Sequence, residues 1–211
     1  MGSSSAICRI SARFFSPLGI EDFLKREAER YGQAISEPVR VILGPRIDEQ
    51  PPALAEEPNA LDIMLWSFRM RRWAGSVADG REAYAPDVRI FVRYHDPETT
   101  LTLDNSVGIE KGMYGIVNAY ASRRLSSQNN VIIAHEFLHT LGATDKYAPE
   151  TAQPLPPDGI AEPGRTPLYP QRYAEIMGGR IALSPDDAEI PRNLGLVVIG
   201  PVTAAEIRLS R

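Results

Sequence analysis

The sequence predicts a mixed α/β fold, in which helices back a sheet of parallel and antiparallel strands. Three observations support this prediction. Strand-like and helix-like segments alternate over the first 125 residues, residues 88–94 alternate apolar and polar side chains, and residues 127–141 form a largely apolar helical segment that ends at a glycine. Prolines crowd residues 149–170, so the part of the chain that joins this segment to the C-terminal region is predicted to be irregular.

Seven elements are predicted before the central helix, each from its local pattern. The first helix follows from Ser16 and Pro17, an N-cap and first-turn signal ahead of apolar residues at helical spacing. The strands follow from β-branched runs or from alternation, with one strand interrupted at Asp104 and Asn105. Residues 47–58, rich in proline and glutamate, are predicted to be a surface loop. In chain order, the elements are a strand at 7–15, a helix at 16–31, a strand at 39–43, a helix at 59–73, and strands at 88–94, 99–110 and 114–121.

The second predicted helix carries an apolar row and a basic cluster. Such a cluster occurs on helices that bind a membrane surface or a partner, and also on the solvated face of a helix that packs on a core. The chain is acidic, with a net charge of −4, which favours the second interpretation. The apolar row is Leu61, Met64, Leu65 and Phe68, and the basic cluster is Arg69, Arg71 and Arg72, near Trp66 and Trp73.

The central helix carries the most chemically informative residues. Its sequence contains the pattern H-E-x-x-H, in a chain that has only three histidines. Positions i and i+4 share one face of a helix, so His135 and His139 can hold one metal ion together. Glu136 can then act as general base toward a water on that ion. The alternative is a buried helix with two hydrogen-bonded histidines and a surface glutamate.

The ends of this helix are also predicted. Ser126 or Ser127 is a plausible N-cap, and Gly142 stands where a left-handed residue would end the helix. The chain can then turn sharply and return Asp145 toward the two histidines.

These residues together resemble the H-E-x-x-H-x-x-G-x-x-H/D signature of the metzincin zinc peptidases, in the snapalysin-type variant that has aspartate at the last position. The resemblance covers residues 135–145. It implies a zinc metallopeptidase with a metzincin-like fold and one zinc ion per chain, bound by His135, His139 and Asp145, with a zinc-bound water activated by Glu136. Most of the clan has a third histidine in place of Asp145. The remaining histidine, His95, is predicted to be a surface turn residue.

The resemblance also implies a methionine in a tight turn beneath the metal. Met177, followed by two glycines, fits that role, although a methionine is more often an ordinary core residue. Tyr147 and Tyr173 are candidates for stabilising an oxyanion, but neither stands where the family places its tyrosine. By the same analogy, an antiparallel edge strand falls at about 104–111, where an extended peptide can pair. The alternative for that segment is a plain hairpin without a ligand.

Two other functions stay open at this stage. A zinc-binding module that acts through a protein partner, without catalysis, would need the same metal ligands. In a gluzincin-type peptidase, a glutamate from a later element would replace Asp145 as the third ligand. The candidates for that role are Glu150, Glu162 and Glu175.

Length and composition predict one domain over residues 1–211, with an N-terminal subdomain at 1–145 and a C-terminal subdomain at 146–211 that ends in a helix at 201–209. The expected partner is a peptide or protein substrate. The acidic charge gives no footprint for nucleic acid, and no apolar run is long enough to span a membrane. A single cysteine, Cys8, excludes an intrachain disulfide. The N-terminal residues lack the features of a signal peptide and resemble an expression scar, which leaves the compartment open.

Overall fold

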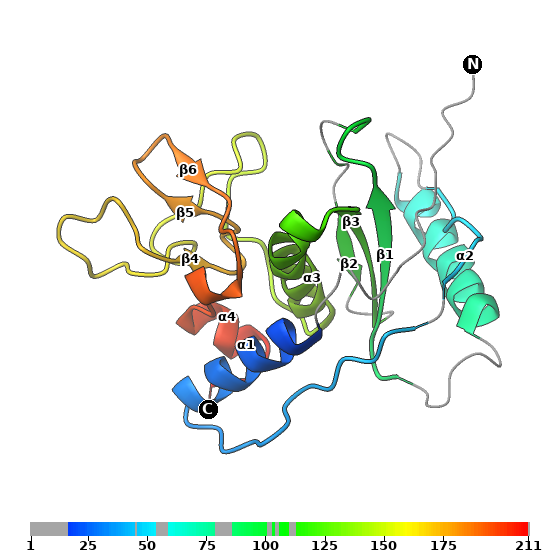
Figure 1. Ribbon diagram of the computed structural model, residues 1–211, viewed down its shortest axis with the longest axis horizontal. Helices are drawn as coiled ribbons and strands as arrows, with labels where there is room; N and C mark the ends of the chain where they lie inside the picture. Colours follow the sequence, from blue (N-terminus) through cyan, green and yellow to red (C-terminus); the bar gives the residue numbers. More distant parts are fainter. Residues whose placement is uncertain are drawn as a thin grey trace. The chain divides into compact units, whose positions relative to one another are not determined.

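Figure 1 shows the computed structural model of the chain. The contacts cluster into two compact units, one formed by described residues before 43 and after 87, the other by those between. The predicted strand at 7–15 lies outside the described residues, and the predicted subdomain boundary at residue 145 stays a prediction. The structure describes residues 17–44, 46–53, 59–78, 86–100, 103, 106–109 and 113–210.

A three-stranded sheet forms one side of the larger unit. Strand β1 (Arg89–His95) pairs in parallel with β3 (Tyr114–Tyr120), and β2 (Val107–Ile109) pairs antiparallel with β3. The order is β1-β3-β2, so β2 lies at an edge. This confirms a mixed α/β fold, and it places an antiparallel edge strand inside the predicted segment 104–111.

One helix packs on this sheet, and a second helix packs on the first. Helix α3 (Ser126–Thr140) follows a 3-10 turn, η2 (Arg123–Leu125), and packs against β3 and β2. Helix α1 (Pro17–Arg30) packs against α3. Figure 1 shows α3 between the sheet and the C-terminal part of the chain. Apolar residues of both helices, of β1 and β3 and of the C-terminal part join one buried cluster, so α3 is held from both sides.

The C-terminal part contains two small sheets and a short helix. The proline-rich stretch before it is irregular, as predicted, and two isolated bridges hold it, Tyr147 to Pro154 and Ile160 to Ala174. The terminal helix is confirmed but is shorter than predicted. The elements are β4 (Ala174–Glu175) parallel to β7 (Val197–Val198), β5 (Ile181–Ala182) antiparallel to β6 (Ala188–Glu189), η3 (Leu194–Leu196) and α4 (Pro201–Glu206).

The smaller unit contains helix α2 (Ala60–Ala78), which confirms the second predicted helix and extends it. The side chain of Asn59 caps it, because its Oδ1 accepts hydrogen bonds from the backbone N–H groups of Leu61 and Asp62. The predicted apolar row is exposed, and Phe68 is 70% exposed. The buried side chains lie on another face of the helix and are Trp66, Met70, Ala74 and Val77.

Two local predictions are wrong. Residues 39–43 form no strand, and no strand in the described ranges pairs with them: Ile42 and Leu43 are exposed, and the N–H of Val41 donates to Glu21 Oε1 at 2.6 Å. The N-cap of α3 is Leu125 rather than a serine, and no side chain caps it there, because the preceding 3-10 turn runs directly into the helix. Within the described part of the chain, no helix has the length and apolar composition needed to cross a bilayer.

Candidate metal centre

Helix α3 presents His135 and His139 one turn apart, as the sequence predicts. The helix ends as predicted at Gly142, whose φ of +98° is accessible to glycine without a Cβ clash. The N–H of Gly142 bonds to the carbonyl of His139, and the N–H of Ala143 bonds to that of Leu138. This pair of bonds is the Schellman arrangement, which reverses the chain direction at the end of the helix.

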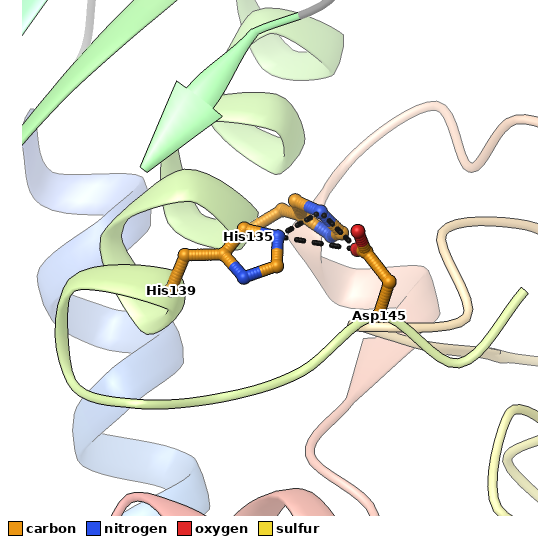
Figure 2. Close-up of side chains that lie close together, drawn as sticks. All are labelled: His135, His139 and Asp145. Atoms are coloured by element: carbon orange, nitrogen blue, oxygen red, sulfur yellow. Dashed lines mark hydrogen bonds and ion pairs between the residues drawn. The ribbon is translucent and has the colours of Figure 1, made fainter. Parts of the chain in front are cut away.

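The reversed chain brings Asp145 back to the two histidines. Its Oδ1 lies 3.2 Å from His135 Nε2 and 3.1 Å from His139 Nε2, and the two Nε2 atoms lie 3.1 Å apart. Figure 2 shows the three side chains pointing toward one another, with Asp145 on the loop that follows α3. This group of two imidazoles and a carboxylate could hold a metal ion.

The other ring nitrogen of each histidine faces a backbone carbonyl. His135 Nδ1 lies 2.9 Å from the oxygen of Ile176, and His139 Nδ1 lies 2.8 Å from the oxygen of Ala143. A carbonyl oxygen only accepts hydrogen bonds, so each Nδ1 carries a hydrogen, and in a neutral ring the lone pair is on Nε2. Neither carbonyl is predictable from the sequence, because no side-chain pattern marks a backbone oxygen as the partner of a distant histidine.

Three electron-pair donors therefore converge on one point. Burial raises the pKa of Asp145, but the hydrogen bonds that it forms when the histidine rings are protonated outweigh this and hold that pKa well below its usual range. Burial lowers the pKa of His139, but its bonds to Asp145 and Ala143 outweigh this and raise it overall. The lowered pKa favours the negatively charged form of Asp145, and the raised pKa favours the positively charged form of His139. Both shifts show that positive charge is favourable beside the Asp145 carboxylate.

The spacing of the donor atoms fits a small divalent metal ion. A tetrahedral ion with ligand bonds of about 2.05 Å separates its ligands by roughly 3.3 Å, close to the distances found here. Zinc accepts two imidazole nitrogens and a carboxylate oxygen, and iron(II) uses the same donor set in other proteins. The residues therefore fit a metal, and the donor set by itself does not select between the two ions.

A cleft opens beside this group, and Glu136 lies in its wall. The side chain of Glu136 is buried, with 5% of its surface exposed. The wall also includes Ser106, just before β2, and the buried Asn118 of β3. The remaining lining residues are Leu103, Val131, Ile132, His135, Tyr147, Ile176, Gly179 and Ile190.

The two candidate tyrosines lie in different environments. Tyr147 lines the cleft, with its ring centroid 6.4 Å from that of His135, and burial together with the charge of Asp145 raises its pKa. Tyr173 is 38% exposed, and the guanidinium of Arg172 lies over its ring, 6.0 Å from the centroid. The cleft lining includes Tyr147 and not Tyr173.

Met177 lies in the turn after β4 and is fully buried. The turn closes through the N–H groups of Gly178 and Gly179, which both bond to the carbonyl of Glu175. The residue before Met177, Ile176, supplies the carbonyl that orients His135. The oxygen of Met177 accepts a hydrogen bond from the N–H of Lys146, so this turn contacts both the histidine and the loop that carries Asp145.

The three downstream glutamates lie elsewhere. Glu175 is fully buried, and its Oε1 accepts bonds from Gly200 N and Thr203 Oγ1, while its Oε2 accepts bonds from Met177 N and Gly178 N. Burial raises the pKa of Glu175. Glu162 pairs with Arg172 and Arg165, and Glu150 is exposed. Among the residues that the structure describes, the only group with metal-ligand spacing is the one that contains Asp145. This geometry favours Asp145 over a glutamate as third ligand.

His95 corrects a prediction. It is the last residue of β1 rather than a surface turn residue, it is half-buried, and its Nε2 lies 3.0 Å from Asn118 Oδ1. The parallel pairing of β1 with β3 brings the two side chains to the same face of the sheet. His95 is not part of the group formed by His135, His139 and Asp145.

Comparisons with known proteins identify no relative: no family model, no curated protein and no solved structure matches the chain.

Proposed function

We propose that this chain is a zinc-dependent peptidase with a metzincin-like site. The observation that carries the proposal is the convergence of His135, His139 and Asp145 beside a cleft that Glu136 also lines. Two histidines with a carboxylate suit zinc or iron(II), but a buried carboxylate next to the first ligand suits hydrolysis, where a general base is needed. This is why zinc is favoured.

The metal ligands in this proposal are the Nε2 atoms of both histidines and Oδ1 of Asp145. When bound, zinc would polarise a substrate carbonyl and lower the pKa of a coordinated water toward about 7. The carbonyls of Ile176 and Ala143 hold the two rings through Nδ1, so that the Nε2 lone pairs would be available to the ion. Met177 directly follows Ile176 in the buried turn and is the proposed Met-turn residue, the methionine that the resemblance implies beneath the metal.

Glu136 is the proposed general base. It takes a proton from the attacking water as the new C–O bond forms at the peptide carbonyl, and it passes that proton to the amine nitrogen as the C–N bond breaks. Tyr147 lines the same cleft and is the better placed of the two tyrosines to donate a hydrogen bond to the developing oxyanion.

Two features support a peptide substrate. Strand β2 pairs with β3 on one side and with no other described strand, so an extended peptide can pair with it beside the cleft. Five aliphatic side chains form the largest class in the cleft lining, and among the described residues that line it, Glu136 is the only acidic one and no lysine or arginine is present. We therefore expect cleavage next to apolar side chains.

The first prediction tests metal and base together. Purified protein should carry about one zinc per chain and should cleave a peptide library, and a chelator should abolish cleavage until zinc is restored. Glu136→Gln should keep the zinc and lower kcat by at least about 100-fold, the usual contribution of a general base. Metal analysis and cleavage assays measure both effects. Glu150→Gln, the same change at an exposed position, should behave like the parent.

Three results would contradict this proposal. Bound iron in place of zinc, without peptide cleavage, would point to a different reaction class. Zinc binding with no cleavage of any peptide would favour a zinc-binding module that acts through a partner. Activity of Glu136→Gln within a few fold of the parent would remove Glu136 from the mechanism.

A further inference from the structure

We propose that Glu206 of α4 is a positioning residue for the metal site: it holds both neighbours of Asp145 and thereby sets where the Asp145 carboxylate lies. The inference rests on the proposed function, because it takes Asp145 to be a metal ligand. It assigns a role to a residue that lies outside the signature of residues 135–145 and comes from the last helix of the chain.

The contacts of Glu206 are specific to the two residues that flank Asp145. Its Oε1 accepts a hydrogen bond from Thr144 Oγ1 at 2.7 Å, and its Oε2 accepts one from the N–H of Thr144 at 3.1 Å. The same Oε2 accepts a bond from Lys146 Nζ at 2.7 Å, and that ammonium also donates to the carbonyl of Thr144 at 2.9 Å. One carboxylate therefore fixes the backbone before Asp145 and the side chain after it.

This support matters because Asp145 lies on an exposed loop. Its side chain is 44% exposed, beyond the end of α3, where it forms ion pairs with the two histidines and a side-chain hydrogen bond with Tyr147. A mobile ligand loses conformational entropy when the metal binds, whereas a loop that is already fixed loses less. The hydrogen bonds of Glu206 to Thr144 and Lys146 should therefore increase metal affinity, although Glu206 itself does not bind the metal.

The partner of Glu206 strengthens the argument. The side chain of Lys146 is only 6% exposed, and a buried ammonium without a counter-charge is strongly unfavourable. Burial raises the pKa of Glu206, but the bonds from Lys146 and Thr144 outweigh this and lower it overall. Without the Glu206 charge, the ammonium of Lys146 would move toward solvent to be hydrated. Because this ammonium also bonds to the carbonyl of Thr144, the backbone around Asp145 would shift as well.

Helix α4 is also anchored at its other end. Glu175 Oε1 accepts bonds from the N–H of Gly200 and from Thr203 Oγ1, while its Oε2 holds the turn whose Ile176 carbonyl orients His135. The position of α4 is therefore tied to one metal ligand through Glu175 and to another through Glu206.

The test measures zinc affinity by competition with a chelator, in the full chain. Loss of a residue that hydrogen-bonds directly to a metal ligand lowers metal affinity by about 10- to 100-fold. Glu206 bonds to the neighbours of Asp145 and not to Asp145 itself, so we expect the lower end of this range. Glu206→Gln should therefore weaken zinc binding by about tenfold. Glu29→Gln, the same change at an exposed position of α1, should leave the affinity unchanged. Thermal unfolding of the zinc-free variants shows whether each has folded.

A double-mutant cycle distinguishes positioning from a general structural effect. If Glu206 acts through Asp145, Glu206→Gln should have almost no effect in an Asp145→Ala background, with a change below about twofold. An equal loss in both backgrounds would overturn the inference, and so would parent-like affinity in Glu206→Gln. A parent chain that binds no zinc would instead overturn the proposed function, and this inference with it.

A milder variant keeps the test decisive if Glu206→Gln unfolds. Thr144→Val removes the hydroxyl that bonds to Glu206 Oε1 and leaves the backbone bond and the Lys146 pair in place. It should lower zinc affinity in the same direction by a smaller factor, again only when Asp145 is present. Unchanged affinity in a folded Thr144→Val would contradict the role of this contact.

Discussion

At the scale of single residues, the candidate site depends on which nitrogen and oxygen atoms already form hydrogen bonds within the protein and which remain available to a metal. The Nδ1 atoms of His135 and His139 bond to carbonyls, which leaves their Nε2 atoms for a metal. Both oxygens of Glu175 accept two hydrogen bonds each, which leaves that carboxylate unsuited to a metal. Asp145 is the carboxylate that lies beside both Nε2 atoms, and this proximity supports the proposal that it is the third ligand.

A second prediction follows for the third ligand. Asp145→Ala should weaken zinc binding by more than about 100-fold, since loss of an outer partner of a ligand already costs about 10- to 100-fold. Glu150→Ala and Glu162→Ala should leave the affinity unchanged, because both side chains lie away from the histidines. Chelator competition measures each value. Unchanged affinity in Asp145→Ala would refute its assignment.

At the scale of elements, two glycines let three loops pack against each other. A Cβ on Gly178, in the turn after β4, would lie 2.0 Å from the carbonyl oxygen of Gly159. A Cβ on Gly159, in the proline-rich segment, would lie 2.0 Å from the oxygen of Lys146. The backbone of this segment therefore packs against both the loop of Asp145 and the turn of Met177, at separations that only glycine allows.

A third prediction concerns this packing. Gly178→Ala must displace backbone, so the free energy of unfolding should fall by at least about 1–3 kcal/mol, the usual effect of overpacking. Zinc affinity should fall as well, because the displaced turn carries the carbonyl that orients His135. Denaturant unfolding and chelator competition measure the two effects. Gly164→Ala, where a Cβ meets open space, is the matched control and should change neither quantity.

At the scale of the whole molecule, the site is assembled from distant parts of the chain. His135 bonds to Ile176, 41 residues later, and Thr144 bonds to Glu206, 62 residues later. Such contacts exist only in the folded state, so a metal that bridges His135, His139 and Asp145 binds the native chain far better than the unfolded one. Binding of this kind stabilises the fold by mass action.

A fourth prediction is the size of this stabilisation. Free zinc at 100 times its Kd should add about 2.7 kcal/mol to the free energy of unfolding. For a chain of 211 residues, Tm should then rise by roughly 5–10 °C. Thermal scans with and without zinc measure the shift, and in Asp145→Ala the same zinc concentration should produce little of it. A parent Tm that does not respond to zinc would contradict a native metal site.

Much of the fold and part of the site could be predicted from local patterns. The spacing of His135 and His139 and the helix end at Gly142 depend on backbone geometry within a few residues, which the sequence specifies directly. Strands β1 and β3 also match their local patterns, and each is the other's partner in the sheet. The strand predicted at 39–43 is wrong because a strand needs a neighbour, and β-branched residues by themselves do not supply one. The buried face of α2 and the pairing of His95 with Asn118 also depend on neighbours.

What the sequence by itself determined is therefore the helix that carries His135, Glu136 and His139, together with a turn able to return Asp145. Only the tertiary structure decided that Asp145 meets both Nε2 atoms, that the carbonyl of Ile176 orients His135, and that Glu206 holds the residues beside Asp145. The physical reason is the separation along the sequence over which each interaction acts. Helix periodicity and glycine conformation act between near neighbours, whereas these hydrogen bonds join segments that only the packing of the whole core brings together.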